Sequence, residues 1–259
     1  MTVEYLYEEC QEIILEAGQL LKNTRKKDYQ IILKDKNEFI TEIDLSVQKY
    51  IVDRINSLGN YNFILEEQRN FNDKQKIENC FVIDPIDGTH NFIAGLPNFA
   101  IAIAYLDQGV VQFGIIHIPE NGDTYNAMIN LGAYKNNEKI KVSKNSDIRK
   151  SIVAYDNQFY KGEKIIRNYE NIVKSVFTTR ILGSACIDSC YVSDGSLDAR
   201  ILNSTKIYDI AAGSRIVEEA GGIVTDFHGE KINFSKVKSV ILSSGMFHNK
   251  LLKIISAEN

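Results

Sequence analysis

Hydrophobic and polar residues follow two different periods along this chain. Apolar residues that recur every three or four positions indicate amphipathic helices, whereas short apolar runs bounded by Gly, Asn or Asp indicate strands. The helical period predicts helices at residues 3–25, 47–58, 164–176, 185 onward and 208–220. The short runs predict strands at residues 31–33, 62–65, 80–83, 99–106, 110–118, 152–155, 178–182 and 197–202. The pattern therefore predicts a mixed α/β protein.

The two halves of the chain order these segments differently. In the first half the later strands follow one another through turn signals such as Asn121-Gly122 and Asn136-Asn137, which favour antiparallel pairing. From Ser151 strands alternate with helices. We therefore expect an antiparallel-rich N-terminal α+β lobe at residues 1–147 and a mixed C-terminal α/β lobe at residues 148–259. No low-complexity linker separates them, so the lobes should pack as one unit.

Composition and charge limit the expected partners. The chain has 259 residues, 44% hydrophobic and 25% charged, which is enough for a substantial core. Its formal net charge of −4 gives no general attraction to nucleic acid or to an anionic membrane, so neither is an expected partner. The four cysteines lie in unrelated contexts, and acidic residues accompany the first apolar ones. Reduced thiols, no signal peptide and a cytoplasmic location are therefore expected.

The segment from Asp84 to Thr89 carries the strongest chemical signal. It follows the apolar run at 80–83 and places two carboxylates three residues apart, with Pro85 between them. The Gly-Thr pair that follows lies at an expected helix start, so the segment offers oxygen ligands for a hard cation beside a site for an anion. The simpler alternative is an Asp/Gly turn in which both side chains cap backbone amides.

Further acidic positions bear on this choice. They are Glu66-Glu67 at the end of an expected strand, Asp209 at the start of an expected helix, and Asp44 three residues after Thr41. Alone, each has a structural explanation as a loop end or a helix cap. Together they supply enough carboxylates for metal-assisted hydrolysis of a phosphate ester. No His or Cys falls inside these acidic clusters, and oxygen-only ligands favour Mg²⁺ over Zn²⁺.

These motifs resemble those of the inositol monophosphatase family, the metal-dependent, lithium-sensitive sugar phosphatases whose superfamily includes fructose-1,6-bisphosphatase. One family signature matches residues 81–92 and the second matches residues 208–222, in the family's order and separation. The resemblance implies a layered α-β-α-β-α sandwich that forms a homodimer. It also implies two or three Mg²⁺ ions and inhibition by Li⁺, which would replace the second Mg²⁺.

The resemblance assigns roles to individual positions. The implied metal ligands are Glu66, Asp84, the carbonyl of Ile86, Asp87 and Asp209. Asp44 and Thr89 match the pair that orients and deprotonates the attacking water. The implied phosphate- and substrate-binding positions are Asp87, Gly88, Thr89, Gly183, Ser184 and Ala185. Lys34 and Glu67 are further possible site residues.

The leaving group is less well defined than the reaction. Leu202 stands where animal inositol phosphatases have a Glu that binds an inositol hydroxyl, whereas Arg200 and Lys206 provide positive charge in the same expected wall. The expected substrate is a small phosphorylated metabolite, an inositol 1-phosphate-like sugar or polyol phosphate. Fructose 1,6-bisphosphate, histidinol phosphate, a nucleotide phosphate or a glycerol phosphate are alternatives. A regulatory binding protein on the same fold is a hypothesis of a different class.

Overall fold

The computed structural model describes residues 1–24, 30–35, 38–68 and 77–256. In this part of the chain the α-helices are α1 (Val3–Thr24), α2 (Glu42–Leu58), α3 (Thr89–Ile93), α4 (Glu163–Ser175), α5 (Ala185–Ser193), α6 (Ile207–Glu219) and α7 (His248–Ser256). The strands are β1 (Ile31–Asp35), β2 (Glu38–Thr41), β3 (Asn62–Leu65), β4 (Cys80–Asp87), β5 (Ala100–Asp107), β6 (Val110–Ile118), β7 (Asp123–Met128), β8 (Gly132–Lys135), β9 (Glu138–Lys139), β10 (Ile152–Tyr155), β11 (Thr178–Arg180), β12 (Ala199–Leu202), β13 (Ile223–Thr225) and β14 (Val240–Ser243).

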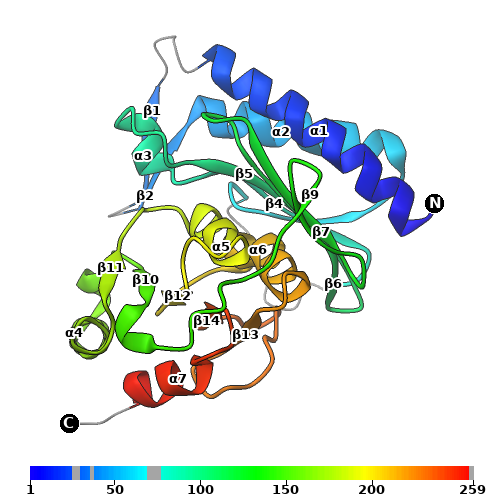
Figure 1. The fold of residues 1–259 in the computed structure, drawn as a ribbon. Helices are drawn as coiled ribbons and strands as arrows, with labels where there is room; N and C mark the ends of the chain where they lie inside the picture. Colours follow the sequence, from blue (N-terminus) through cyan, green and yellow to red (C-terminus); the bar gives the residue numbers. More distant parts are fainter. Residues whose placement is uncertain (25–29, 36–37, 69–76, 257–259) are drawn as a thin grey trace.

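These elements stack in five layers (Figure 1). Helices α1 and α2 cover one face of a sheet ordered β3-β4-β5-β6-β7-β8-β9, and α5 and α6 cover its other face. A second sheet, ordered β11-β10-β12-β14-β13, lies beyond α5 and α6 and is covered on its far side by α4 and α7. The predicted α-β-α-β-α sandwich is therefore confirmed.

Strand alternation explains why both sheets are covered on two faces. In β4, Phe81 and Ile83 belong to the core with α1 and α2, whereas Cys80 and Val82 belong to the core with α5 and α6. Because side chains of a strand point alternately to its two faces, a continuous apolar run requires a helical layer on each side. The apolar runs in the sequence thus determine where the helices pack.

The two sheets differ in their strand directions. In the first sheet β3 pairs parallel with β4, and every later neighbour pairs antiparallel. In the second sheet β10 pairs parallel with β11 and with β12, whereas β14 runs antiparallel to β12 and β13. The antiparallel-rich first sheet and the mixed second sheet agree with the expected fold class. The lobe boundary near residue 147 stays a prediction.

Helix α6 approaches its neighbours closely because small residues face it. A Cβ added to Gly114 of β6 would lie 2.5 Å from the carbonyl oxygen of Ala212 in α6. A Cβ added to Gly213 of α6 would lie 2.5 Å from the side chain of Ser189 in α5. Such distances leave no room for a methyl group, so these glycines set the position of the central helical layer.

Some elements differ from the sequence prediction. Strand β2 was not predicted, and it pairs antiparallel with β1. Strand β11 ends at Arg180 instead of Leu182, because the chain leaves the sheet to form the turn at Gly183, where φ is +76°. The expected basic end of the first helix, residues 25–27, lies outside the described residues.

Candidate functional site

A β-bulge brings Asp84 and Asp87 together at the end of β4. The two residues are three apart in β4, but their partners in β5 are only two apart. Residues three apart in a regular strand point to opposite faces, and one extra residue cancels that difference. Pro85 lies beyond Ile83, where the pairing with β3 ends, so its missing N–H interrupts no pairing on that side. The bulge thus lets both carboxylates approach the same place.

Four carboxylates form one cluster, in which Asp84 and Asp87 are buried and Glu66 and Asp209 are half-buried. Asp84 is only 1% exposed, and its Oδ1 accepts no hydrogen bond from any residue that the structure describes. Burial raises the pKa of Asp84 well above its usual range, and the charges of Glu66, Asp87 and Asp209 raise it further. Each negative charge opposes the ionisation of its neighbours, so a bound cation would stabilise the whole cluster. The donor set, which consists of carboxylate oxygens, fits Mg²⁺.

Asp87 also faces the N-terminus of α5. The N–H of Ala185 donates to its Oδ1 at 3.2 Å, and the N–H of Cys186 donates to its Oδ2 at 2.8 Å. The Ser184 hydroxyl donates to the same Oδ2. These donors favour the ionised form, but burial has the larger effect and raises the pKa of Asp87. Asp87 therefore connects the acidic cluster to the turn at Gly183.

Asp209 is the third residue of α6, whereas the simple structural explanation required it to be the N-cap. Its Oδ2 accepts hydrogen bonds from the Thr205 hydroxyl at 2.8 Å and from the N–H of Lys206 at 2.7 Å. Burial raises the pKa of Asp209 to about 6. One carboxylate oxygen stabilises the helix start, while the other can serve a cation.

Asp44 and Thr89 come together from separate helices. The N–H of Thr41 donates to Asp44 Oδ2 at 2.7 Å and the N–H of Asp44 donates to Thr41 Oγ1 at 3.3 Å, so the capping box is present. The Thr89 hydroxyl lies 2.9 Å from the Ile86 carbonyl oxygen and 3.4 Å from Asp44 Oδ1. Burial raises the pKa of Asp44, which is fully buried. A hydroxyl beside a carboxylate of raised pKa can relay a proton from water.

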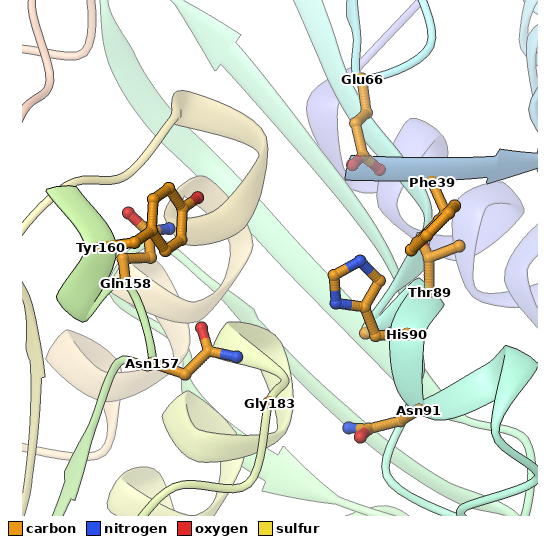
Figure 2. A pocket seen from close by; sticks show the side chains of 10 residues that line it. Phe39, Glu66, Thr89, His90, Asn91, Asn157, Gln158, Tyr160 and Gly183 are labelled. Carbon is orange, nitrogen blue, oxygen red and sulfur yellow. The ribbon is translucent and has the colours of Figure 1, made fainter. Parts of the chain in front are cut away.

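A cavity of about 430 Å³ opens beside this pair. Its lining residues are Phe39, Glu66, Gly88, Thr89, His90, Asn91, Asn157, Gln158, Tyr160 and Gly183. Figure 2 shows Asn157, Gln158 and Tyr160 on one wall, facing Thr89 and His90 across the cavity. Residues from both halves of the chain thus surround the space next to the acidic cluster.

Asn91 connects α3 to the chain just before the turn at Gly183. Its Nδ2 donates to the carbonyl oxygens of Asn98 and Leu182, both at 2.7 Å. Gly88 lies nearby with φ of +88°, and a Cβ there would come within 2.7 Å of the Asn98 carbonyl oxygen. The Asn-Phe pair after the Gly-Thr motif is the sequence signal for this contact, but its long-range partner is visible only in the fold.

The two positively charged candidates for substrate binding, Arg200 and Lys206, have different surroundings. A smaller cavity of about 120 Å³ is lined by residues that include Asp87, Ser184, Arg200, Leu202 and Asp209. Lys206 is exposed and lines neither cavity, as far as the described residues show. Arg200 is therefore better placed for a substrate contact than Lys206.

Arg200 is a buried cation. It is 4% exposed, and its Nη1 lies 3.1 Å from Oδ2 of the fully buried Asp188. Burial raises the pKa of Asp188 to about 7, against the opposing effect of Arg200. The positive charge of Arg200 also opposes the rise in the pKa of Asp87 and of Asp209 that burial causes. The Arg200 guanidinium thus favours the ionised forms of Asp87 and Asp209.

Glu67 and Lys34 are the other two possible site residues. The N–H of Glu67 donates to Gln48 Oε1 at 3.1 Å, and Glu67 does not line the larger cavity among the described residues. Lys34 belongs to β1, and its side chain lies outside the described part of the chain.

Cys186 lies beside Asp84 and Asp87, although no cysteine falls inside the acidic motifs of the sequence. One ligand atom each from Asp84, Asp87 and Cys186 lies within 4.8 Å of the others. The sequence could not show this, because Cys186 is remote from both aspartates along the chain and reaches them through the first turn of α5. Burial raises the pKa of the Cys186 thiol well above its usual range, and Asp87 and Asp84 add to this effect.

Comparison with known proteins decides the family. The model of the Inositol monophosphatase family matches residues 2–259. The chain belongs to the inositol monophosphatase family. This family member is 38% identical over 220 residues to a fructose-1,6-bisphosphatase/inositol-1-monophosphatase of Thermotoga maritima, a match that covers 85% of this chain and 83% of that protein.

Other relatives carry a different name. The chain is 32% identical over 209 residues to the Nus factor SuhB of Pasteurella multocida, covering 79% of this chain and 78% of that protein. The solved structure of an IMPase from Thermotoga maritima superposes with a TM-score of 0.83 at 34% identity, covering 94% of each chain. This inositol monophosphatase family member is thus a phosphoric monoester hydrolase by family, and the family is metal-dependent. Within the described residues no helix is both long and apolar enough to cross a membrane.

Proposed function

We propose that this protein is a Mg²⁺-dependent phosphomonoesterase that hydrolyses inositol 1-phosphate-like sugar or polyol phosphates. The observation that carries this proposal is the cluster of Glu66, Asp84, Asp87 and Asp209 next to the Asp44–Thr89 pair. Four neighbouring carboxylates, two of them buried, are unfavourable without cations, and the adjacent cavity leaves room for a small phosphate ester. We also propose that the protein acts in the cytoplasm on a small metabolite and does not contact nucleic acid.

The proposed roles are those that the family resemblance implies for these positions, and the contacts described above support them. Glu66, Asp84, Asp87, Asp209 and the Ile86 carbonyl would hold two or three Mg²⁺ ions. When bound, these ions would neutralise phosphate charge, lower the pKa of a water and stabilise the leaving alkoxide. Asp44 and Thr89 would orient the attacking water and accept its proton. Backbone amides of Gly88 and Thr89 would hold the phosphate, and the turn at residues 183–185 would contact the leaving group.

A panel of phosphate monoesters, assayed with and without Mg²⁺, tests the reaction. We expect Mg²⁺-dependent phosphate release, and we expect Asp84→Asn and Asp209→Asn to lose it because each removes a negative oxygen from the cluster. Li⁺ titrated against Mg²⁺ should inhibit. Phosphate release without metal, or full turnover in both Asn variants, would contradict the proposal.

A bisphosphate substrate is a second candidate, favoured by Arg200. Its buried guanidinium lines the smaller cavity beside Asp87, and a second anionic group of a sugar bisphosphate could reach it there. The Thermotoga maritima relative is named for both activities. We expect Arg200→Gln to lower kcat/KM for fructose 1,6-bisphosphate by about tenfold or more relative to inositol 1-phosphate, the loss of one charged hydrogen bond. Lys206→Ala is the matched control and should leave the ratio unchanged.

A regulatory role is the candidate from another class. Relatives named Nus factor SuhB support it by name. The complete set of Asp44, Glu66, Asp84, Thr89 and Asp209, together in one site, favours catalysis, because a protein retained only for binding has no need of these acids. The Mg²⁺ assay above separates the two candidates.

A further inference from the structure

The sulfur of Cys186, a soft metal ligand, lies beside two carboxylates, which are hard ligands. Asp84, Asp87 and Cys186 are all buried, and one ligand atom from each lies within 4.8 Å of the other two. Asp84 Oδ1 has no hydrogen-bond donor among the described residues, although Asp84 is only 1% exposed. An unpartnered buried carboxylate oxygen beside a thiol is an incomplete polar site, and a cation would complete it.

The helix start explains why the sulfur lies there. Ser184 is the N-cap of α5, with its Oγ accepting from the N–H of Ile187 at 3.2 Å. Cys186 is then the second residue of the first turn, and its N–H donates to Asp87 at 2.8 Å. Backbone and side chain of one residue therefore both approach the cluster. The Cys186 Sγ lies 3.8 Å from the Asp209 carbonyl oxygen. This hydrogen bond is weak, and a metal–sulfur bond would be stronger.

We propose that Asp84, Asp87 and Cys186 form a second-choice site for a thiophilic divalent cation such as Cd²⁺ or Zn²⁺, with the Cys186 sulfur as a direct ligand. Mg²⁺ would use only the oxygens, because thiolates are poor ligands for hard cations. A softer cation would recruit the sulfur: the S–H bond breaks, a metal–sulfur bond forms, and the proton passes to solvent. The two kinds of cation would then compete, because they share Asp84 and Asp87.

Neighbouring Cys190 provides a matched control. It is as buried as Cys186, lies one turn further along α5, and does not belong to the group of three ligand atoms. Cys190→Ser and Cys186→Ser therefore make the same chemical change in the same helix. Circular dichroism and thermal unfolding would establish that each variant is folded, and Cys186→Ala provides a second version without a hydroxyl.

Cd²⁺ titration of the full-length, metal-stripped protein tests this inference. The readout is the ultraviolet charge-transfer absorption of a thiolate–cadmium bond, with affinity from competition against a chromophoric chelator. Wild type and Cys190→Ser should develop the band with one equivalent of Cd²⁺, and excess Mg²⁺ should reduce it. Both Cys186 variants should lose the band and bind Cd²⁺ about tenfold or more weakly, while their Mg²⁺ affinity is kept.

Two results would overturn the inference. One is a band that persists in folded Cys186→Ser, and the other is a band that excess Mg²⁺ leaves unchanged, which would place the cation elsewhere. The inference rests on the proposed function only in that both use Asp84 and Asp87. Because Cd²⁺ binding is measured without substrate, a protein that binds Cd²⁺ through Cys186 but hydrolyses no phosphate would refute the proposed function and leave this site standing.

Discussion

Removal of the Thr89 hydroxyl has the most specific expected effect on catalysis. It lies 3.4 Å from Asp44 Oδ1 and 2.9 Å from the Ile86 carbonyl oxygen, so it joins the proposed base to the end of β4. We expect Thr89→Val, which keeps the shape but removes the hydroxyl, to lower kcat by roughly 10²- to 10⁴-fold, the usual contribution of a proton-transfer group. KM should change little, because the phosphate would be held by backbone amides. Steady-state phosphate release measures both constants.

Thr89→Ser is the control for this prediction. It restores a hydroxyl to the same backbone position, so most of kcat should return. Equal losses in the Val and Ser variants would show that the methyl group, and hence packing, matters more than proton transfer.

His117 should make stability depend on pH. It lies in β6 against Gly18 of α1, its Nδ1 is 2.9 Å from the Thr124 hydroxyl, and burial lowers its pKa from 6.5 to about 4. Between these values the unfolded chain binds a proton that the folded protein does not. The contribution of His117 is therefore complete above pH 6.5 and is lost as the pH falls toward 4, by up to about 3 kcal/mol.

Comparison of wild type with His117→Gln isolates this contribution. Other titrating groups, including buried His248, are shared by both proteins, so the difference in unfolding free energy should shrink from pH 7 to pH 5. Urea unfolding at several pH values measures it. Parallel curves across this range would mean that His117 is not the titrating group.

At the scale of elements, local patterns predicted most of what the structure contains. The apolar runs and helical periods identified α1, α2, β3, β5, β6, α4 and α6, because each has one period over several turns or a run bounded by Gly or Asn. Strand β2 was missed because Glu38–Thr41 is short, carries a charge and depends on β1 for its hydrogen bonds. Strand β4 continues beyond its apolar run to Asp87 only because the bulge at Pro85 maintains pairing with β5.

The site was predictable to the extent that its residues lie inside motifs. Asp84, Asp87 and Thr89 are close in sequence, and the structure brings Asp209 and Glu66 to them. Cys186 and Asn91 were missed for the same physical reason: their contacts come from distant segments, through the first turn of α5 and the Leu182 carbonyl. A periodic pattern shows which face of an element is buried, but not which side chain of the neighbouring layer it meets.

At the scale of the whole molecule, the edge of the second sheet is incompletely covered. Strand β11 lies at the end of the order β11-β10-β12-β14-β13, so one of its edges has no partner strand among the described residues. Two apolar side chains flank it: Phe177 is 71% exposed and Ile181 is 41% exposed. An exposed sheet edge with large apolar residues is a place where chains associate. The homodimer that the family resemblance implies would cover it with a second copy of this chain.

We therefore expect the protein to be a dimer in solution and Phe177→Asp to weaken it. Burying one Phe side chain contributes roughly 1.5–3 kcal/mol, so a charge at this position should raise the dimer dissociation constant by about tenfold or more. Sedimentation equilibrium over a range of concentrations measures it. Leu131→Asp is the control, because Leu131 is also exposed, at 53%, but lies after β7 in the other sheet. A monomer at all concentrations, or equal weakening by both variants, would exclude the β11 edge as the interface.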